Sequence, residues 1–429
     1  MKRRRSKKVS RLAISALSVA AISLSATPAT GVTSPGSSAA AATVIPVSPS
    51  EVHNYTWFNK KFDPDPHAEV VAHVIRLINA APRGAKLSLT LYYFDRKAIV
   101  EALRHATDRE VEVRLVVDGY MVGNYFHDAL KAIPKVKLVE CDPTPSGGKA
   151  DRGCMSNRIG SSPLDKPPVM HNKFMTIDKV KLAGGGTAKN VLYVASANLD
   201  TAFHAYESAL TISHERLYEH YVKYFNDLMY YGSHPKEVNN NYGKTSKVGK
   251  HRVYTFPRKE AGNRPRSASN DPIADILRRT TCAPSGKTRI DVANFRIQRQ
   301  AVVNELIAAR TRGCQVRIVT GDGSLSGAKT LARAMPVHLC AETEAGGRPV
   351  HEKFMIVRQG AQSMLYAGSH NLTYRALRQN DENILGLRNH PVAGPYQQRF
   401  EYLHGECKPW KPTSNVAPPA NADDEGDAD

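Results

Sequence analysis

The sequence predicts an α/β fold made of two similar lobes, each a mixed, largely parallel sheet flanked by helices. Two observations lead to this prediction. The same order of short apolar runs and helix-like segments occurs twice along the 429 residues. Within each copy, strand-like runs alternate with helical patterns, which is typical of sheets with helices packed on their faces. The length also exceeds what a single compact core usually holds.

Each copy opens with a short aromatic strand followed by a helix start. Tyr55–Phe58 in the first copy is echoed by Tyr254–Phe256 in the second. Asp65-Pro66 and Asp271-Pro272 follow these strands. Each dipeptide places an N-cap carboxylate before a proline at the first helical position, which predicts that a helix begins there.

A strand, a helix and another strand come next in each copy. Apolar runs predict the strands, and apolar residues at helical spacing predict the helices between them. The predicted elements are Leu87–Phe94, Lys97–Ala106 and Val111–Val117 in the first copy, and Ile290–Phe295, Gln300–Ala309 and Gln315–Thr320 in the second.

Composition divides the chain into five segments. Residues 1–42 are predicted to be a signal peptide and flexible leader, 43–235 the N-terminal lobe, and 236–270 a polar linker with one edge strand. Residues 271–410 are predicted to form the C-terminal lobe, and 411–429 a disordered acidic tail. The first lobe carries an insertion at 142–168 that the second lacks.

The leader predicts export. Seven basic residues lie within the first eleven positions, and the small, apolar stretch Leu12–Ala26 follows them. This pattern is typical of a cleaved signal peptide, with cleavage near Ala29 or within Ala39–Ala42, although an uncleaved anchor is the alternative. We therefore expect a secreted protein.

The charge balance points to anionic partners. The formal net charge is +19, and about +12 remains once the seven basic residues of the leader are set aside. A basic surface attracts nucleic acid, acidic lipid headgroups or anionic wall polymers. The alternative is that the charge serves only solubility.

Six cysteines in an exported chain predict disulfides. Cys141 and Cys154 flank a loop rich in Gly, Pro and Ser, and they are the best candidate pair. The pairing of the other four cysteines stays open, and none of the spacings is that of a metal finger.

A His-x-Lys string occurs in an apolar run in each copy. His171 and Lys173 form the first string, and His351 and Lys353 the second. If each string lies on a strand, the imidazole and the ammonium group point to the same face. A third string, His234-Pro235-Lys236, has polar surroundings, and we interpret it as surface.

Each string is followed by a second strand-like run, a Ser-x-Asn string and a carboxylate. These are Ser196, Asn198 and Glu207 in the first copy, and Ser369, Asn371 and Glu382 in the second. Lysines within apolar runs are costly to bury without an anion, so paired Lys and His residues favour a phosphate ligand. The alternative is a pair of core histidines and capping asparagines without activity.

These strings resemble the signature of the phospholipase D superfamily, His-x-Lys-x4-Asp with Gly-Ser-x-Asn downstream. The resemblance extends from about Val52 to Glu406. It implies two lobes in a pseudo-twofold arrangement with one active site between them. It also implies that His171 and His351 are the nucleophile and general acid, and that the phosphate is held by Lys173, Lys353, Asn198 and Asn371. The implied supporting residues are Ser196, Ser369, Glu207, Glu382 and Asp178.

Two positions depart from the signature. Arg358 stands where the second Asp is expected, and Ala195 replaces the first Gly of Gly-Ser-x-Asn. We expect the Arg358 departure to weaken the packing of the second lobe more than its chemistry. Reduced activity is a further expectation.

The resemblance and the residue types together predict a metal-independent phosphodiesterase that needs no cofactor. Imidazole serves as a nucleophile and imidazolium as an acid near neutral pH. We expect a monomeric phospholipase D that hydrolyses phospholipid headgroups at a membrane surface and yields phosphatidate. The alternatives are a secreted nuclease of the same superfamily, or a catalytically weakened binder of anionic polymers, which Arg358 suggests.

Overall fold

The computed structural model describes residues 43–61, 64–143, 151–159, 166–201, 204–260, 268–282, 287–341 and 348–412. All of them belong to one compact unit. The predicted signal peptide with its cleavage sites and the acidic tail from residue 413 lie outside the described residues. Within the described ranges, no helix has the length and hydropathy needed to span a bilayer.

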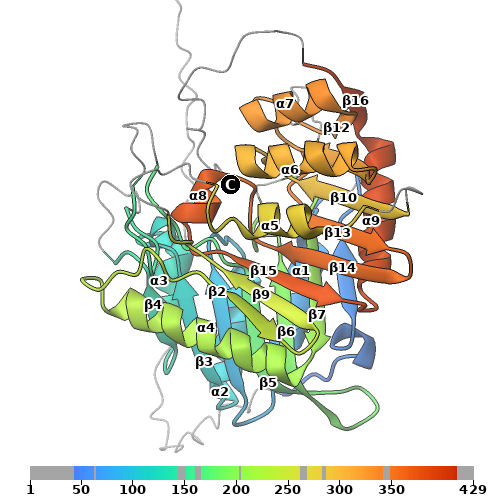
Figure 1. The fold of residues 1–429 in the computed structure, drawn as a ribbon. Helices are drawn as coiled ribbons and strands as arrows, with labels where there is room; N and C mark the ends of the chain where they lie inside the picture. Colours follow the sequence, from blue (N-terminus) through green and yellow to red (C-terminus); the bar gives the residue numbers. More distant parts are fainter. Residues whose placement is uncertain are drawn as a thin grey trace, which may run out of the picture. The chain divides into compact units, whose positions relative to one another are not determined.

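The N-terminal lobe, by which we mean β1–β7 with α1–α4, is coloured blue to green in Figure 1. Its strands are β1 (Tyr55–Phe58), β2 (Lys86–Leu91), β3 (Glu112–Val117), β4 (Lys137–Glu140), β5 (Phe174–Lys181), β6 (Thr187–Ala195) and β7 (Ser208–Ser213). Its helices are α1 (Ala68–Asn79), α2 (Lys97–Asp108), α3 (Tyr125–Lys131) and α4 (Glu215–Ser233), with short 3-10 turns at Pro49–Glu51 and Gly119–Met121.

The C-terminal lobe comprises β8–β16 with α5–α9. Its strands are β8 (Thr245–Val248), β9 (His251–Thr255), β10 (Thr288–Asn294), β11 (Gln315–Thr320), β12 (Val337–Leu339), β13 (Lys353–Gln359), β14 (Gln362–Gly368), β15 (Asn383–Arg388) and β16 (Lys408–Trp410). Its helices are α5 (Pro272–Arg279), α6 (Gln300–Thr311), α7 (Ser326–Ala334), α8 (Tyr374–Arg378) and α9 (Ala393–Glu406).

Both sheets are mixed and flanked by helices, as predicted, but they are mainly antiparallel rather than largely parallel. The first has the order β1-β7-β6-β5-β2-β3-β4 and the second β16-β12-β11-β10-β13-β14-β15-β9-β8. Among the strands that the structure describes, only the neighbours within β2-β3-β4 and β10-β11-β12 run parallel. The strands around the His-x-Lys strings are joined by tight turns, such as Gly184–Gly186 with its three positive φ angles, and therefore pair antiparallel.

Three apolar clusters define the layers. The outer face of the first sheet packs on α1 and α2, and the outer face of the second packs on α5 and α6. The inner faces of both sheets pack on α4 and α9, and their buried residues form one continuous cluster. Tyr221, Tyr224 and Phe225 of α4 belong to this shared core. The two lobes are therefore held by a common interior.

The predicted helix start is confirmed in one lobe and wrong in the other. Asp271 caps α5, accepting hydrogen bonds from the N–H groups of Ile273 and Ala274. In the N-terminal lobe, α1 begins only at Ala68, without a side-chain cap. Asp65 instead accepts two hydrogen bonds from the guanidinium of Arg96, at 2.6 and 2.7 Å. The Asp65 carboxylate is thus held by Arg96, just before α2 of the same lobe, and does not cap α1.

The predicted linker contributes to the second sheet. Residues 236–270 contain two strands, β8 and β9, rather than the single edge strand that we predicted, and β9 pairs with β15. The disulfide between Cys141 and Cys154 is confirmed. The other two disulfides join Cys282 to Cys314 and Cys340 to Cys407, both within the C-terminal lobe.

Candidate active site

The two histidines lie just before strands β5 and β13, not within them as predicted. The segment that leads to each histidine forms a short parallel bridge with the other lobe. The His171 N–H donates to the Asp381 carbonyl at 3.0 Å, and the His351 N–H donates to the Tyr206 carbonyl at 2.9 Å. Cross-lobe backbone bonds therefore replace the regular strand ladder at both histidines.

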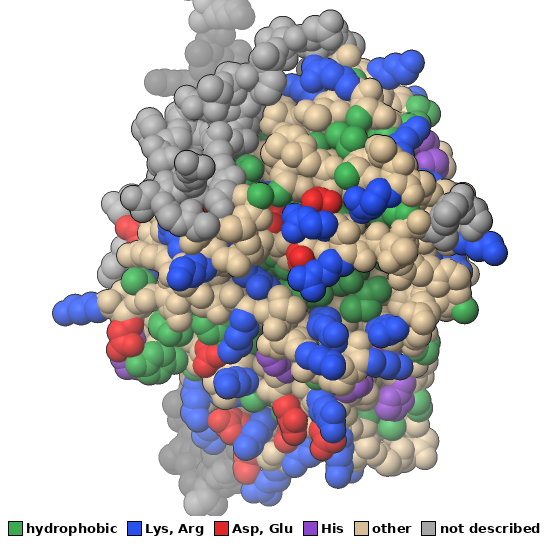
Figure 2. Space-filling model, in the orientation of Figure 1, with side chains coloured by type: hydrophobic (Ala, Val, Ile, Leu, Met, Phe, Trp, Pro, Cys, Tyr) green, Lys and Arg blue, Asp and Glu red, His purple; other side chains and the backbone are tan. Residues whose placement is uncertain are grey.

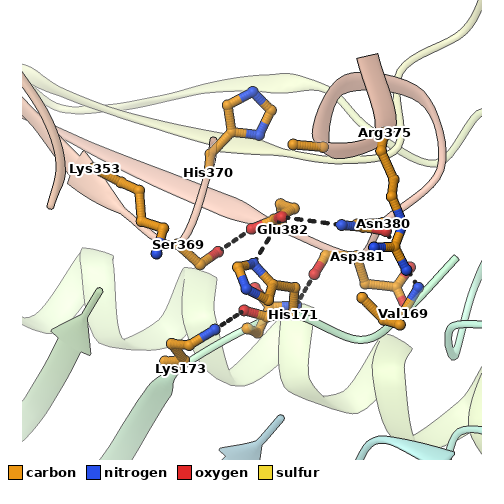
Figure 3. A network of polar contacts seen from close by, with 12 residues as sticks. Val169, His171, Lys173, Lys353, Ser369, His370, Arg375, Asn380, Asp381 and Glu382 are labelled. Carbon is orange, nitrogen blue, oxygen red and sulfur yellow. Dashed lines mark hydrogen bonds and ion pairs between the residues drawn. The ribbon is translucent and has the colours of Figure 1, made fainter. Parts of the chain in front are cut away.

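Each histidine is held by a carboxylate from the opposite lobe. Nδ1 of His171 lies 2.8 Å from Oε1 of Glu382, and Nδ1 of His351 lies 2.5 Å from Oε1 of Glu207. Figure 3 shows Glu382 between His171 and Ser369, whose hydroxyl donates to the carboxylate at 2.5 Å. Ser196 donates to Glu207 at the same distance. All of these groups are buried.

This arrangement fixes the tautomer of each ring. A carboxylate accepts the proton of Nδ1, which leaves Nε2 as the nitrogen that can react. Burial alone would raise the pKa of Glu207, but the charge and hydrogen bond of His351, with the charge of Lys353, lower that pKa to about 2. Glu207 therefore stays ionised and orients the imidazole.

Two buried ammonium groups accompany the rings. Lys173 and Lys353 are each 4% exposed. Nζ of Lys353 lies 2.7 Å from Nε2 of His351, and Nζ of Lys173 donates to the His171 carbonyl at 3.2 Å. Figure 3 shows both lysines on the same side of the His171 ring although they come from different lobes. Such a cluster of cations suits an anionic oxygen ligand.

The predicted asparagines are both buried at this site. Asn198 is 3% exposed, and neither atom of its amide has a hydrogen-bond partner among the described residues. It lines a small cavity of about 10 Å³ together with Lys173 and Tyr92. A buried polar side chain without a partner is costly, so this amide is placed to bind a ligand. Asn371 is fully buried at the equivalent position of the other lobe.

Comparison with known proteins decides the family. The model of the PLD-like domain described as "Cardiolipin synthase, PLD-like domain" matches residues 74–229 and 282–404, one copy in each lobe. The chain belongs to the phospholipase D superfamily. The predicted duplication is thereby confirmed, and the coarse function is that of a phospholipase D superfamily enzyme acting at a phosphodiester or transferring a phosphatidyl group.

Solved structures show the same two-lobed fold. Phosphatidylserine synthase from Haemophilus influenzae is 14% identical, with a TM-score of 0.52 over 83% of this chain and 87% of that one. Polyphosphate kinase from Porphyromonas gingivalis is 12% identical, with a TM-score of 0.50 over 82% of this chain. The present chain covers only 50% of that kinase. No curated protein sequence matches the chain.

Aromatic rings that the sequence analysis missed pack on both histidines. Tyr92 lies edge-on to His171 at 4.9 Å between ring centroids, and Phe295 lies edge-on to His351 at 4.8 Å. Lys173 sits over the Tyr92 ring at 4.8 Å. Each aromatic residue directly follows the equivalent strand, β2 or β10, so an alignment of the two repeats would have identified this pair.

The structure does not bring Asp178 to the site. This Asp of the superfamily signature lies near the far end of β5, where its carboxylate accepts the Lys86 N–H at 2.8 Å and ties β5 to β2. Arg358 occupies the corresponding end of β13, is exposed, and faces Arg289 in the register. The departure from the signature therefore lies away from the histidines.

The second departure from the signature, Ala195, is accommodated by the packing of the N-terminal lobe. Ala195 is buried at the end of β6 and faces Ala209 of β7. At the equivalent place in the C-terminal lobe, a Cβ on Gly368 would lie 2.3 Å from the Asn383 carbonyl oxygen. Only the C-terminal lobe thus needs the glycine of the superfamily signature.

Two buried carboxyl groups behind His171 were also missed. Asp118 accepts the Met170 N–H at 2.6 Å, and Asp381 accepts the N–H groups of Cys154 and Met155 at 2.6 and 3.2 Å. Burial raises the pKa of Asp118 to about 6 and that of Asp381 to about 8. Nothing in the sequence distinguishes them, because their effect depends on burial and on partners distant in the chain.

We expect the stability of the protein to fall as the pH rises, because of Asp381. Its pKa is about 8 in the folded state and about 3.9 in the unfolded state. The folded chain therefore retains a proton that the unfolded chain loses. The proton retained on Asp381 contributes a few kcal/mol to the free energy of unfolding. This stabilisation is fully present below about pH 4 and is lost as the pH rises through about 8.

The variant Asp381→Asn tests this expectation. The amide oxygen still accepts the Cys154 N–H, but the group cannot ionise. Between about pH 5 and 8.5, the Tm measured by circular dichroism should fall less in the variant than in the wild type. Asp108→Asn, at an exposed position, serves as the control. An equal fall in Asp381→Asn and wild type would contradict the role given to Asp381.

Proposed function

We propose that the protein is a secreted phospholipase D that hydrolyses the headgroup ester of a phospholipid to phosphatidate. The observation that carries the proposal is the pair of imidazoles, each oriented at Nδ1 by a carboxylate of the opposite lobe. Histidine Nε2 groups held in this way are suited to one nucleophilic and one acid–base task. Three disulfides among the described residues support export to an oxidising compartment.

The first step forms a phospho-histidine. Following the superfamily resemblance, we assign the attack to Nε2 of His171, which forms an N–P bond as the P–O bond to the headgroup breaks. The Nε2 proton of His351 passes to the oxygen of the departing alcohol. Lys173 and Lys353 counter the charge that grows on the phosphoryl oxygens, and Asn198 and Asn371 donate further hydrogen bonds to them.

The second step reverses the roles. His351, now neutral, takes a proton from a water molecule, and the water oxygen attacks phosphorus. The N–P bond breaks, His171 regains its free Nε2, and phosphatidate leaves. Within the described residues, no cluster of three or more His, Cys, Asp or Glu side chains is arranged as a metal site. The residues named above carry both steps.

Two substrates separate the proposal from its alternatives. We expect the purified protein to release choline from phosphatidylcholine vesicles, with equal rates in excess chelator and without it. Nicking of plasmid DNA without choline release would favour the nuclease. The absence of both activities would favour a binder of anionic polymers. In every case we expect the protein to be a monomer in solution. A two-lobed single chain supports the lipase, because nucleases of the superfamily usually have one motif and dimerise.

Rapid quenching tests the assignment of the nucleophile. The protein is mixed with phosphatidylcholine, quenched in alkali, digested, and analysed by mass spectrometry. We expect the phosphatidyl group on the peptide that contains His171. A modified His351 peptide would exchange the two roles, and modification of neither would contradict the covalent mechanism.

A further inference from the structure

A groove lies on the outer face of the second sheet, beside α5. Its volume is about 450 Å³, which is within the usual range of ligand sites. Tyr254, Ile276 and Met364 contribute apolar surface to the groove, and Lys250, Arg252 and Arg388 also line it. Figure 2 shows a hollow on this face in which hydrophobic side chains are bordered by Lys and Arg.

Comparison of the two lobes explains why the groove is open. Counted from the site carboxylates, Thr211 and Gly386 occupy equivalent positions in β7 and β15. Thr211 is covered by His73 of α1, whose Nε2 lies 2.8 Å from its hydroxyl and whose ring stacks on Tyr55. Gly386 has no side chain, and the atoms nearest to a Cβ built there belong to Arg252 and Met364, at 3.2 to 3.4 Å.

The helix above the groove is also shorter. Helix α5 has 8 residues, whereas α1 has 12. The chain segment before β1 further fills the N-terminal lobe, where Val52 is fully buried and Glu51 contacts His73 at 3.4 Å. The space between the outer face of the sheet and the first helix is therefore filled by side chains in the N-terminal lobe and left open in the C-terminal lobe.

Three of the four cations that line the groove have no acidic partner in the part of the chain that the structure describes. Among the described residues, no carboxylate lies within 4.0 Å of Lys250, Arg252 or Arg388. Arg252 donates only to the His251 carbonyl and Arg388 only to the Gln362 side chain, both at 2.8 Å. Asp275 and Arg279 also line the groove, and they pair with each other at 2.9 Å. The guanidinium groups thus keep further N–H groups for an anion.

We propose that this groove binds an anionic phospholipid of a membrane surface. Its phosphate would lie between Arg252 and Arg388, and the start of an acyl chain would lie over Ile276 and Met364. These apolar side chains favour a lipid over a hydrophilic polyanion, which would leave them without a partner. Val357 lines the groove four residues beyond Lys353 on β13, so this is a second lipid contact, separate from the catalytic groups.

Vesicle sedimentation tests the proposal without turnover. All proteins carry His171→Ala, so that the lipid is not consumed. Vesicles of phosphatidylcholine with and without phosphatidylglycerol are spun down with the protein. We expect binding to the mixed vesicles, and a loss of roughly tenfold or more in the partition coefficient when Arg252→Ala and Arg388→Ala are combined.

Two further variants separate a specific groove from diffuse attraction. Lys179→Ala with Lys189→Ala removes the same charge from the β5–β6 hairpin and should leave binding within about twofold of the parent. Met364→Trp fills the groove but keeps its cations, and it should weaken binding. Equal losses in the two double variants, or full binding by a folded Met364→Trp protein, would overturn the proposal.

Soluble poly(glycerol phosphate) provides the last arm of the test. If it binds the protein through Arg252 and Arg388 while mixed vesicles do not, the occupant is a polymer and the lipid proposal is wrong. Folding of each variant is checked by its thermal unfolding curve. Because binding is measured without catalysis, failure here would leave the proposed phospholipase activity standing.

Discussion

Replacing His171 or His351 with alanine is expected to lower kcat/KM by about a thousandfold or more while the protein stays folded. Each variant removes an imidazole that a buried carboxylate orients and that a lysine accompanies. Without His171 no phospho-histidine forms in the proposed mechanism, and without His351 the departing alcohol receives no proton. Combining the two substitutions should cost little more than either alone, because the residues act as a unit.

The sequence supplies a matched control for this experiment. His234 also lies two residues before a lysine, but it is exposed at the end of α4. His234→Ala should keep wild-type activity. The measurement is choline release under initial-rate conditions, with thermal unfolding to verify the fold. Wild-type activity in His171→Ala or in His351→Ala would refute the assignment of that residue.

Replacing Glu382 with glutamine is expected to lower kcat by about a hundredfold to ten-thousandfold. An amide in this position keeps the shape of the side chain but no longer stabilises the charged imidazole or selects the Nδ1–H tautomer. The effect falls on His171, which belongs to the other lobe and lies 2.8 Å away. Glu207→Gln should act in the same way on His351.

The pH profile separates this role from a purely structural one. Loss of the carboxylate should shift the acidic limb of kcat against pH, whereas a folding defect would lower activity evenly at all pH values. Glu219→Gln, at an exposed position of α4, is the control. An unchanged kcat in Glu382→Gln would mean that the cross-lobe hydrogen bond does not orient the nucleophile.

The bounds of many helices and strands depend on the local sequence pattern and could therefore be predicted. The bounds of β11, α2 and α6 follow from apolar periodicity, and the structure places them within two residues of the prediction. The direction of the strands is not local. The alternation of strands and helices suggested parallel pairing, but the long motif strands return through short turns and pair antiparallel.

The site was predictable where it is repeated. His171 and His351 were found because the same string occurs twice, and Glu207 and Glu382 because each follows its Ser-x-Asn string. What the sequence could not show is the exchange of carboxylates between lobes, since either glutamate could have served its own histidine. Asp381 was missed for a related reason: its burial depends on Cys154 and Met155, more than 200 residues earlier in the chain.

The exchange of carboxylates also sets a time at which the enzyme becomes competent. His171 and Glu382 are separated by 211 residues, and His351 follows Glu207 by 144. A growing chain that has not yet reached Glu382 therefore has no carboxylate to orient His171. We therefore expect activity to arise only when synthesis is nearly complete and both lobes have docked.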